Sequence, residues 1–350
     1  MKKILVLGVQ VPFVRGGAEL LNESLVREIN RLDGVQAELV SLPFKGYPDN
    51  QVLNDIMTLR LIDIREANGI KVDIVIPTKF PSYVAEHRKK ILYLVHQHRL
   101  FYDLEKTEFD ASVNAPDSRT IRNKVRELDS KFINECKEKY TISKNVSERL
   151  IRFNGIESKP LYPPSPIAPE IYCEDYNDTI LYIGRIDPIK RVRLLIESLE
   201  YTKKAKVTII GKGIKTYEEE LISIAYKKNV IDRCEFLGYV PDSELVHHLA
   251  NTRALFYAPV DEDYGFAAVE AFLAKKPVIT CDDSGEVKTL VSQTGAGIVS
   301  SSDPKQIADS IDRVYGMNQA QLEVCVHGGY EFAKSITWGK VLQKLVLENL

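Results

Sequence analysis

Short apolar runs alternate with helix-periodic segments along almost the whole chain, and this alternation is the strongest constraint on its fold. In the first half such runs occupy residues 4–9, 37–42, 72–77 and 91–96, bounded by glycine, proline or polar residues. Each run is too short for a helix of ordinary length, whereas the segments between them have helical spacing. The pattern predicts parallel sheets covered by helices, as in α/β proteins.

A proline-rich segment divides the pattern into two halves. Residues 160–166 include Pro160, Pro163, Pro164 and Pro166, and proline continues neither a helix nor a central strand. With 350 residues the chain also exceeds the usual size of one core. We expect two α/β domains facing across a cleft, with a boundary after residue 168. Further strands are predicted at residues 179–183, 206–210, 234–237, 254–258 and 277–281.

Composition excludes several classes of protein. The net charge of -2 creates no field that would favour nucleic acid, so no nucleic-acid partner is expected. Five cysteines stand without a Cys-x-x-Cys pair, which predicts neither a zinc site nor a disulfide framework and suits a reducing cytoplasm. Because no apolar run approaches the ~20 residues of a membrane span, any membrane contact is expected to be peripheral.

The strongest candidate site is the strand, loop and helix start of residues 254–272. The loop carries three carboxylates at residues 261–263, and Gly265 separates it from the following helix. That helix carries Glu270 about one turn after its start. The first amides of that helix precede any intrahelical acceptor, so with the helix dipole they can hold an anion or sugar hydroxyls. Taken alone, the stretch is better explained as a solvated acidic loop before a core helix.

Polar and glycine residues also follow the other predicted strands. Carboxyl ends of parallel strands meet at one edge of a sheet, where ligands of open α/β sheets bind. Cations near free amides suit a diphosphate, while carboxylates suit the hydroxyls of ribose or a sugar, a combination that describes a nucleotide sugar. No Gly-x-Gly-x-x-Gly fingerprint is present, so a dinucleotide is not indicated. The residues concerned are Gly16, Gly17, His96, Arg185, Lys190, Gly211, Gly213, Glu262 and Glu270.

Six motifs in the same order along the chain resemble family 4 retaining glycosyltransferases with the GT-B fold of two Rossmann-like domains. The most specific is Glu262 and Glu270 with seven residues between them. The others are Gly16-Gly17-Ala18-Glu19, Val95-His96, the pair Thr141-Ile142-Ser143-Lys144 and Tyr162-Pro163-Pro164, Tyr182-Ile183-Gly184-Arg185 with Lys190, and Phe236-Leu237-Gly238-Tyr239-Val240.

The resemblance implies an amino-terminal acceptor-side domain of residues 1–168, a donor-side domain of residues 169–328, and a helical segment of residues 329–350 that crosses back to the first. It implies that Arg185 and Lys190 neutralise the diphosphate, helped by Gly16 and Gly17, and that His96 contacts the donor sugar or reacting centre. Glu270 would bind ribose; Glu262 with Gly265, Phe266 and Ala267 would bind the transferred sugar; and Gly211, Gly213 and Val240 would lie near the base. Neither a metal nor a cofactor is implied.

The expected reaction is transfer of a hexose-type sugar to a glycan, a lipid-linked molecule or a small molecule. Two alternatives keep the same fold: a nucleotide-sugar epimerase or hydrolase, and a non-catalytic nucleotide-sugar-binding partner subunit. A glycosidase acid and base pair is a weaker interpretation, because hydrolases seldom need a neighbouring diphosphate site. Arg191 and Lys275 depart from the family, which usually has glycine there, so we expect the turn at Lys275 to differ from the family's.

Overall fold

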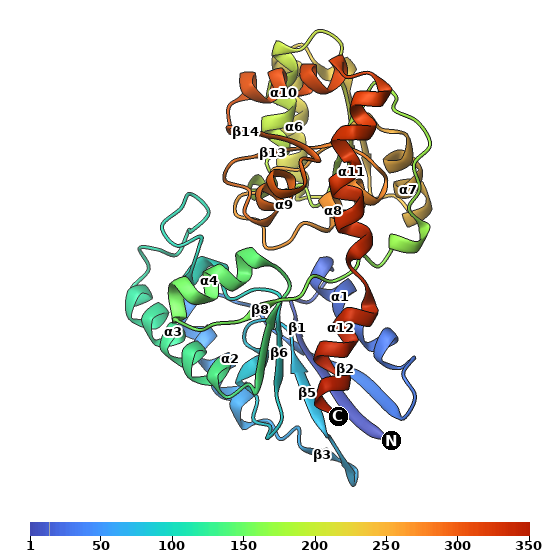
Figure 1. Ribbon diagram of the computed structural model, residues 1–350. Helices are drawn as coiled ribbons and strands as arrows, with labels where there is room; N and C mark the ends of the chain where they lie inside the picture. Colours follow the sequence, from blue (N-terminus) through green and yellow to red (C-terminus); the bar gives the residue numbers. More distant parts are fainter. Residues whose placement is uncertain (14) are drawn as a thin grey trace. The chain divides into compact units, whose positions relative to one another are not determined.

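The computed structural model describes residues 1–13 and 15–350 and divides them into two compact units (Figure 1). Unit 1 comprises Met1–Pro166 and Thr337–Leu350, and unit 2 comprises Ile167–Ile336. The division at the linker falls after residue 166, where the sequence analysis expected 168. The chain returns to unit 1 at residue 337 and not at 329, because α11 (Gln319–Ser335) is one continuous helix packed on two helices of unit 2.

Unit 1 is built on a parallel sheet. One part has the order β2-β1-β5 and the other the order β6-β7-β8. A parallel bridge between Val75 and Lys90 joins β5 to β6, so the strands continue from one part into the next. The four apolar runs predicted in this half all contain strands. The strands are β1 (Lys2–Gln10), β2 (Val35–Pro43), β5 (Ile74–Pro77), β6 (Ile91–Leu94), β7 (Glu138–Thr141) and β8 (Lys159–Pro160).

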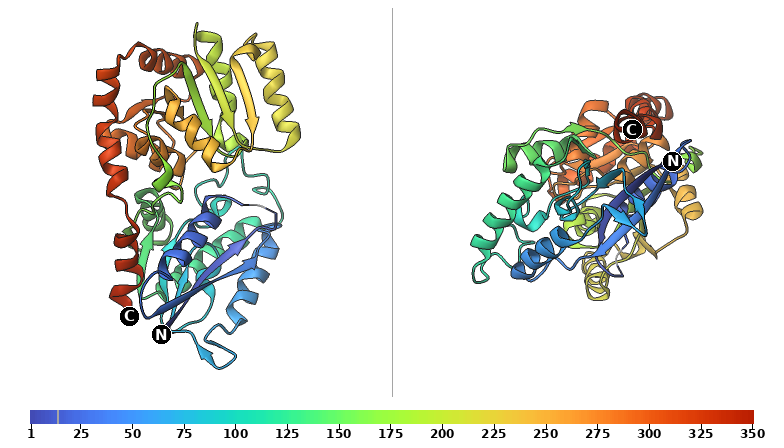
Figure 2. Two further views of the ribbon diagram at one scale, coloured as in Figure 1. Left: turned by 90° about the vertical axis from the view of Figure 1, so that its right-hand side faces the viewer. Right: turned by 90° about the horizontal axis from the view of Figure 1, so that it is seen from below.

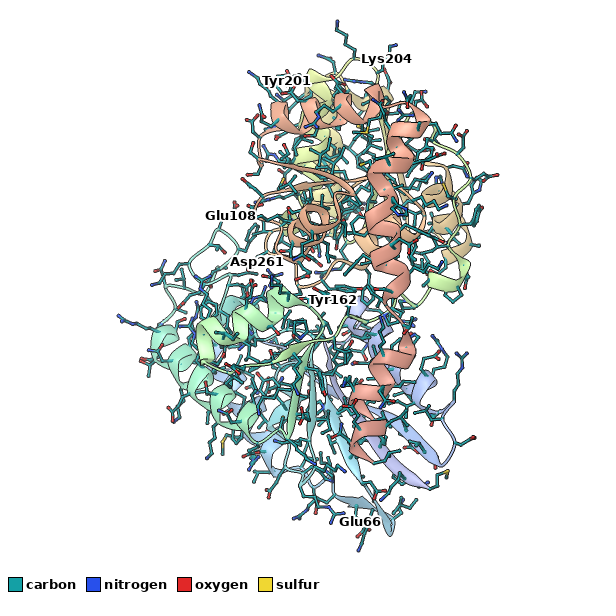
Figure 3. The ribbon with its side chains drawn as sticks, in the orientation of Figure 1. Glu66, Glu108, Tyr162, Tyr201, Lys204 and Asp261 are labelled. Carbon is teal, nitrogen blue, oxygen red and sulfur yellow. The ribbon has the colours of Figure 1, made fainter. Side chains whose placement is uncertain are left out.

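Helices cover this sheet, and a small hairpin extends from it. At the start of α4 the Ser143 hydroxyl accepts from the Val146 amide, and Gly155 at φ 64° ends this helix. Glu66 lies at the hairpin (Figure 3). The elements are α1 (Gly17–Ile29), α2 (Asp49–Leu61), α3 (Ser118–Asn134), α4 (Lys144–Asn154), α12 (Trp338–Leu345), β3 (Glu66–Ala67) and β4 (Ile70–Lys71).

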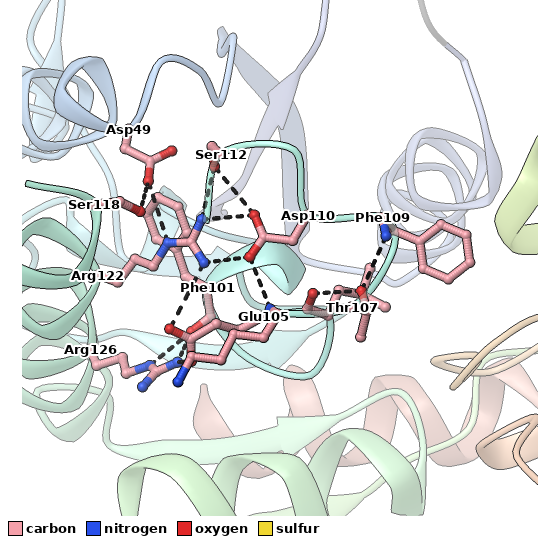
Figure 4. A network of polar contacts seen from close by, with 12 residues as sticks. Asp49, Phe101, Glu105, Thr107, Phe109, Asp110, Ser112, Ser118, Arg122 and Arg126 are labelled. Carbon is pink, nitrogen blue, oxygen red and sulfur yellow. Dashed lines mark hydrogen bonds and ion pairs between the residues drawn. The ribbon is translucent and has the colours of Figure 1, made fainter. Parts of the chain in front are cut away.

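The segment of residues 102–115, whose sequence is polar and irregular, is anchored by buried charges (Figure 4). Arg122 of α3 is 1% exposed; its guanidinium donates to both carboxylate oxygens of Asp110 at 2.6 and 2.8 Å and reaches Asp49 at 3.3 Å. Arg126 forms a second ion pair with Glu105 at 2.6 Å. The loop is therefore held by charge-assisted hydrogen bonds that its irregular, polar sequence did not reveal.

Unit 2 is a six-stranded parallel sheet with the order β11-β10-β9-β12-β13-β14. This is the Rossmann order, in which the direction of strand addition reverses between β9 and β12. All five strands predicted in this half are present, and β14 is the one the sequence analysis did not name. The bounds are β9 (Thr179–Ile183), β10 (Lys206–Ile210), β11 (Cys234–Gly238), β12 (Ala254–Phe256), β13 (Val278–Cys281) and β14 (Gly297–Ser300).

The helices of unit 2 form two packed groups on its sheet (Figure 2). In one group α5 contacts α6 and α10, and in the other α8 and α9 both contact α11. Side chains of the strands and of α5, α6 and α10 form a continuous buried core. The bounds are α5 (Val192–Ser198), α6 (Lys215–Lys227), α7 (Asp242–Asn251), α8 (Phe266–Leu273), α9 (Glu286–Thr294) and α10 (Pro304–Gly316).

Candidate functional site

A lysine and a glutamate meet at the switch point of unit 2. Lys190 ends a short 3-10 turn, η4 (Pro188–Lys190), in the loop after β9, and Glu262 lies in the loop after β12. The Lys190 Nζ atom is 2.6 Å from Glu262 Oε2, and the two side chains are only 14% and 13% exposed. The structure therefore joins two residues predicted for the donor site, at the edge where open α/β sheets bind ligands.

The side chain of Tyr257, the residue after β12, contacts both members of this pair. Its hydroxyl is 3.2 Å from Glu262 Oε1 and 3.5 Å from Lys190 Nζ. Burial, followed by the negative charge of Glu262, raises the pKa of Tyr257 well above its ordinary value, so the phenol stays protonated and donates to the carboxylate. The charge of Glu270 in α8 also raises this pKa.

Backbone hydrogen bonds tie the loops of this edge together. The Val260 amide donates to the Ile189 carbonyl at 2.9 Å, which joins the loops after β12 and β9. The Asp261 amide donates to the Asp283 carbonyl at 2.9 Å, which joins the loops after β12 and β13. Figure 3 labels Asp261 on this segment. The side chains of the site thus stand on mutually braced loops, an arrangement that preorganises them.

The predicted helix start is present at α8. The first hydrogen bond of the helix runs from the Ala268 amide to the Gly265 carbonyl at 3.0 Å, so the amides of Phe266 and Ala267 precede it. Gly265 has φ 88° and ψ 69°. A Cβ atom there would lie 2.6 Å from Cγ2 of Val287, closer than real Cβ contacts allow. Glycine is therefore required both by conformation and by space.

Arg185 follows β9 and combines a fixed backbone with an exposed head group. The buried hydroxyl of Tyr182 donates to the Arg185 carbonyl at 2.7 Å. The guanidinium is 59% exposed and pairs with Asp187 at 3.3 Å. Asp187 also accepts from the Lys190 amide at 3.2 Å and so caps the turn that carries the lysine. Both predicted cations are thereby presented from one short loop.

Close backbone packing explains the glycines after β10. A Cβ on Gly211 would lie 1.8 Å from the Gly184 carbonyl oxygen, and one on Gly213 would lie 2.0 Å from that of Ile186. The loops after β9 and β10 thus run against each other, which only glycine permits. Val240, after β11, is buried. The role of these residues near a base stays a prediction.

The glycine loop of unit 1 is closed by its own ion pair. The Glu19 carboxylate accepts from the Gly16 amide at 2.9 Å, and its other oxygen is 2.9 Å from Nζ of Lys79. Burial opposes ionisation of Glu19, but the hydrogen bond and charge of Lys79 outweigh it and lower the pKa of that carboxyl. Gly17 begins α1. This pair lies at the switch point of unit 1, between β1 and β5.

His96 lies at the same edge of unit 1. Its carbonyl accepts from the Phe80 amide at 3.2 Å, which links the end of β6 to the loop after β5. Its Nδ1 atom is 2.7 Å from the Gln97 carbonyl oxygen, so Nδ1 carries the proton. The predicted site residues thus form two sets, one in each unit, and the prediction that they act on one ligand stays a prediction.

The two departures from the family, Arg191 and Lys275, both have a positive φ angle, a conformation that glycine adopts most readily. Arg191 has φ 57° and Lys275 has φ 54°. The Arg191 guanidinium forms two hydrogen bonds to the Asp283 carboxylate, at 2.6 and 2.5 Å, which hold it in this left-handed conformation. Lys275 thus adopts the left-handed geometry that lysine tolerates poorly, and the expected difference from the family's turn stays a prediction.

Sequence reasoning missed three residues that shape the site: Tyr182, Tyr257 and Lys79. Each tyrosine belongs to an apolar run, where periodicity marks it only as core. Tyr257 could have been found from its position: it follows a buried strand directly, so its hydroxyl lies at the edge of the sheet where ligands bind. Lys79 belongs to a loop without a motif, and its partner is distant in sequence.

Residues 1–13 and 15–350 contain neither a group of metal ligands nor a membrane-spanning helix. Within that described part, no three or more His, Cys, Asp and Glu side chains are grouped so as to hold a metal ion. No helix in the same ranges is both long and apolar enough to cross a membrane.

Two parallel α/β units in one chain, with a polar site at the switch point of the second, define the class as a GT-B protein. The family model for glycosyl transferases group 1 matches residues 174–327, nearly the whole of unit 2. This match makes unit 2 similar to group 1 glycosyltransferases, and the relatives described next are named as glycosyltransferases as well.

Two relatives and one solved structure are similar to this chain at low sequence identity. An uncharacterised glycosyltransferase of Methanocaldococcus jannaschii is 22% identical over 360 residues, which cover 97% of this chain and 95% of that protein. The D-inositol 3-phosphate glycosyltransferase of Frankia alni is 27% identical over 150 residues, 39% of this chain but only 36% of that protein. The structure of Anabaena HepE in complex with UDP-glucose has a TM-score of 0.70 at 17% identity, with 100% of both chains covered.

Proposed function

We propose that this protein is a retaining glycosyltransferase that moves a hexose from a nucleotide-diphosphate sugar to a glycan, a lipid-linked molecule or a small molecule. The supporting observation is the contact of Lys190 with Glu262 at the switch point of unit 2, beside the N-terminus of α8. Cations and helix amides suit a diphosphate, and carboxylates suit sugar hydroxyls. The UDP-glucose bound to the structurally similar HepE supports a ligand of this class.

In the proposed reaction the bond from C1 of the sugar to the diphosphate breaks, and a bond from C1 to the acceptor oxygen forms on the same face. The proton of the acceptor hydroxyl passes to the leaving diphosphate, so no protein nucleophile is needed. Arg185, Lys190 and the amides of Phe266 and Ala267 stabilise the charge that develops on the diphosphate and sugar. These groups supply the positive charge without a metal ion or cofactor.

The remaining roles follow the geometry within each unit. Glu262 accepts from hydroxyls of the transferred sugar, and Glu270, mostly buried in α8, accepts from the ribose hydroxyls. In unit 1, Gly17 presents its amide to the diphosphate, and Gly16, whose amide is bound to Glu19, lets the backbone approach the diphosphate closely. His96 contacts the sugar through Nε2 while Nδ1 is bound to Gln97. We further propose a cytoplasmic enzyme whose membrane contact, with a lipid-linked acceptor, is peripheral.

Calorimetry with UDP, GDP, dTDP, UDP-glucose and GDP-mannose tests the donor site. At least one nucleotide should bind, and Arg185→Ala should weaken it by about 1.5–3 kcal/mol, because a charge-assisted contact to phosphate is lost. Glu270→Ala should weaken binding by about 1–3 kcal/mol through unpaired ribose hydroxyls. Arg193→Ala is the matched control, since that arginine is 53% exposed on α5 and pairs with Glu197 outside the site.

NMR of the products separates transfer from the alternatives. With donor alone, the proposed transferase should hydrolyse its substrate only slowly, whereas an epimerase or hydrolase would consume it. With an acceptor panel, the anomeric configuration of the product should match that of the donor. If no nucleotide binds and Arg185→Ala changes nothing, the donor-site interpretation is wrong.

A further inference from the structure

Tyr257 contacts Glu262 at a different carboxylate oxygen from the one that Lys190 contacts. Glu262 uses its two carboxylate oxygens differently: Oε2 faces Lys190 at 2.6 Å, and Oε1 faces the Tyr257 hydroxyl at 3.2 Å. These two contacts do not share an acceptor atom. The Glu262 carboxylate therefore keeps one hydrogen-bond donor if the other is drawn away.

The tyrosine is itself held rigidly. It is 6% exposed, and its ring packs so closely on Gly265 that a Cβ there would lie 3.1 Å from its Cε1 atom. The Lys190 ammonium lies 5.7 Å from the ring centre, within the range of a cation–π contact. A buried, protonated phenol fixed in this way is a preorganised donor.

Donor binding redistributes these contacts. Without ligand, Lys190 neutralises Glu262, and a diphosphate carries more negative charge than one carboxylate. When the diphosphate binds, it competes for the ammonium and weakens the hold of Lys190 on the glutamate. Glu262 must nevertheless stay in place, because it is the group assigned to the transferred sugar.

We propose that Tyr257 is a positioning residue that keeps Glu262 oriented toward the transferred sugar while Lys190 engages the diphosphate. This inference rests on the proposed function and adds to it a residue that specifically supports recognition of the sugar. It separates two parts of the donor: the cations and amides hold the diphosphate, and the pair of Glu262 and Tyr257 holds the sugar.

The test compares binding of a nucleotide with binding of its sugar. Calorimetry is performed on the full chain with UDP and UDP-glucose, and with GDP and GDP-mannose. Tyr257→Phe should weaken the sugar nucleotide about ten- to a hundredfold, the effect of losing a hydrogen bond to a charged group, and leave the free nucleotide almost unchanged. A merely structural role would weaken both ligands equally.

Two further variants sharpen the comparison. Tyr93→Phe removes the buried hydroxyl that donates to the Leu161 carbonyl at 2.9 Å in unit 1, so it controls for a lost buried hydrogen bond away from the site. It should lower thermal stability without changing the preference for the sugar nucleotide. Tyr257→Phe combined with Glu262→Ala should bind the sugar nucleotide no more weakly than Glu262→Ala alone, because the tyrosine acts through the glutamate.

The outcomes distinguish the two proposals. If the wild type binds a sugar nucleotide and Tyr257→Phe retains the full preference for it, the role of Tyr257 is refuted and the proposed function stands. If the wild type binds none of the four ligands, the proposed function fails and the role of Tyr257 fails with it. Additive effects of the two substitutions would also overturn the positioning role.

Discussion

Substitution of Gly265 by alanine tests the geometry on which the candidate site depends. The residue combines φ 88° with a space that a Cβ atom would share with Val287 Cγ2 at 2.6 Å and with the Tyr257 ring at 3.1 Å. The left-handed conformation costs alanine about 1–2 kcal/mol, and overpacking adds about 1–3 kcal/mol. Gly265→Ala should therefore destabilise unit 2 by about 2–5 kcal/mol.

Gly295→Ala is the matched control. Gly295 lies in the same unit at φ 69°, after α9, and nothing lies within 4 Å of the Cβ that alanine would add. Its substitution should cost only the conformational part, about 1 kcal/mol. The difference in stability between the two variants thus measures the cost of the contact with Val287 and Tyr257, because the cost of the left-handed backbone is common to both.

Urea unfolding provides the assay, because the two units can be followed separately. The single tryptophan, Trp338, belongs to unit 1, so its fluorescence reports that unit, while far-UV circular dichroism reports both. The transition seen by dichroism alone is assigned to unit 2. Combining Gly265→Ala with Val287→Ala should recover about 1–2 kcal/mol beyond additivity, because the clashing methyl is removed.

Equal destabilisation by Gly265→Ala and Gly295→Ala would refute this reasoning. It would mean that Val287 and Tyr257 move aside without a loss of stability, and that only the backbone conformation requires glycine at this position. A loss of nucleotide affinity in Gly265→Ala with unchanged stability would instead show that the alanine displaces the first amides of α8 without strain.

Two further predictions concern titration and backbone conformation. Burial raises the pKa of Asp129 to about 7, while the Tyr102 hydroxyl bond opposes that rise; the unfolded chain titrates near 4, so wild-type stability should fall as pH rises from about 4 to about 7 and then level. Asp129→Asn should remove this slope in urea unfolding measured from pH 5 to 8, and an unchanged slope would contradict the assignment. Lys275→Gly should raise the melting temperature of unit 2, because the left-handed strain of about 1 kcal/mol disappears, although the contact of Lys275 with the Tyr330 ring is lost; a lower melting temperature would show that this contact outweighs the strain.

The strands could be predicted from the sequence because each apolar run has both the length of a strand and the apolar character that burial in a parallel sheet requires. Residues 179–183 and 206–210 form β9 and β10 with the predicted bounds, since both are buried parallel strands ended by glycine. The order of the strands was not readable, because no local pattern records which strand is a neighbour. That order is what brings Lys190 and Glu262 together.

The contacts that hold the site could not be predicted for a different reason. Tyr257 joins Glu262 through a hydroxyl on an otherwise apolar ring, and Lys79 joins Glu19 across sixty residues of sequence. Sequence periodicity records which face of an element is buried, but it does not record where the polar tip of a buried side chain points. The anchoring of the loop at residues 102–115 could not be predicted for the same reason, because its partner Arg122 lies on the following helix.

Each unit carries a lysine–glutamate pair at its switch point, yet the partners of the two glutamates indicate different tasks. Glu19 accepts from the Gly16 amide, so separating it from Lys79 would loosen the loop that leads into α1. Glu262 is instead contacted by two side chains, one of which is a cation suited to phosphate. A backbone partner cannot leave without deforming the chain, whereas an ammonium can turn toward a ligand by rotating its own side chain. We therefore expect the pair in unit 2 to exchange contacts with a charged ligand, and the pair in unit 1 to fix a loop.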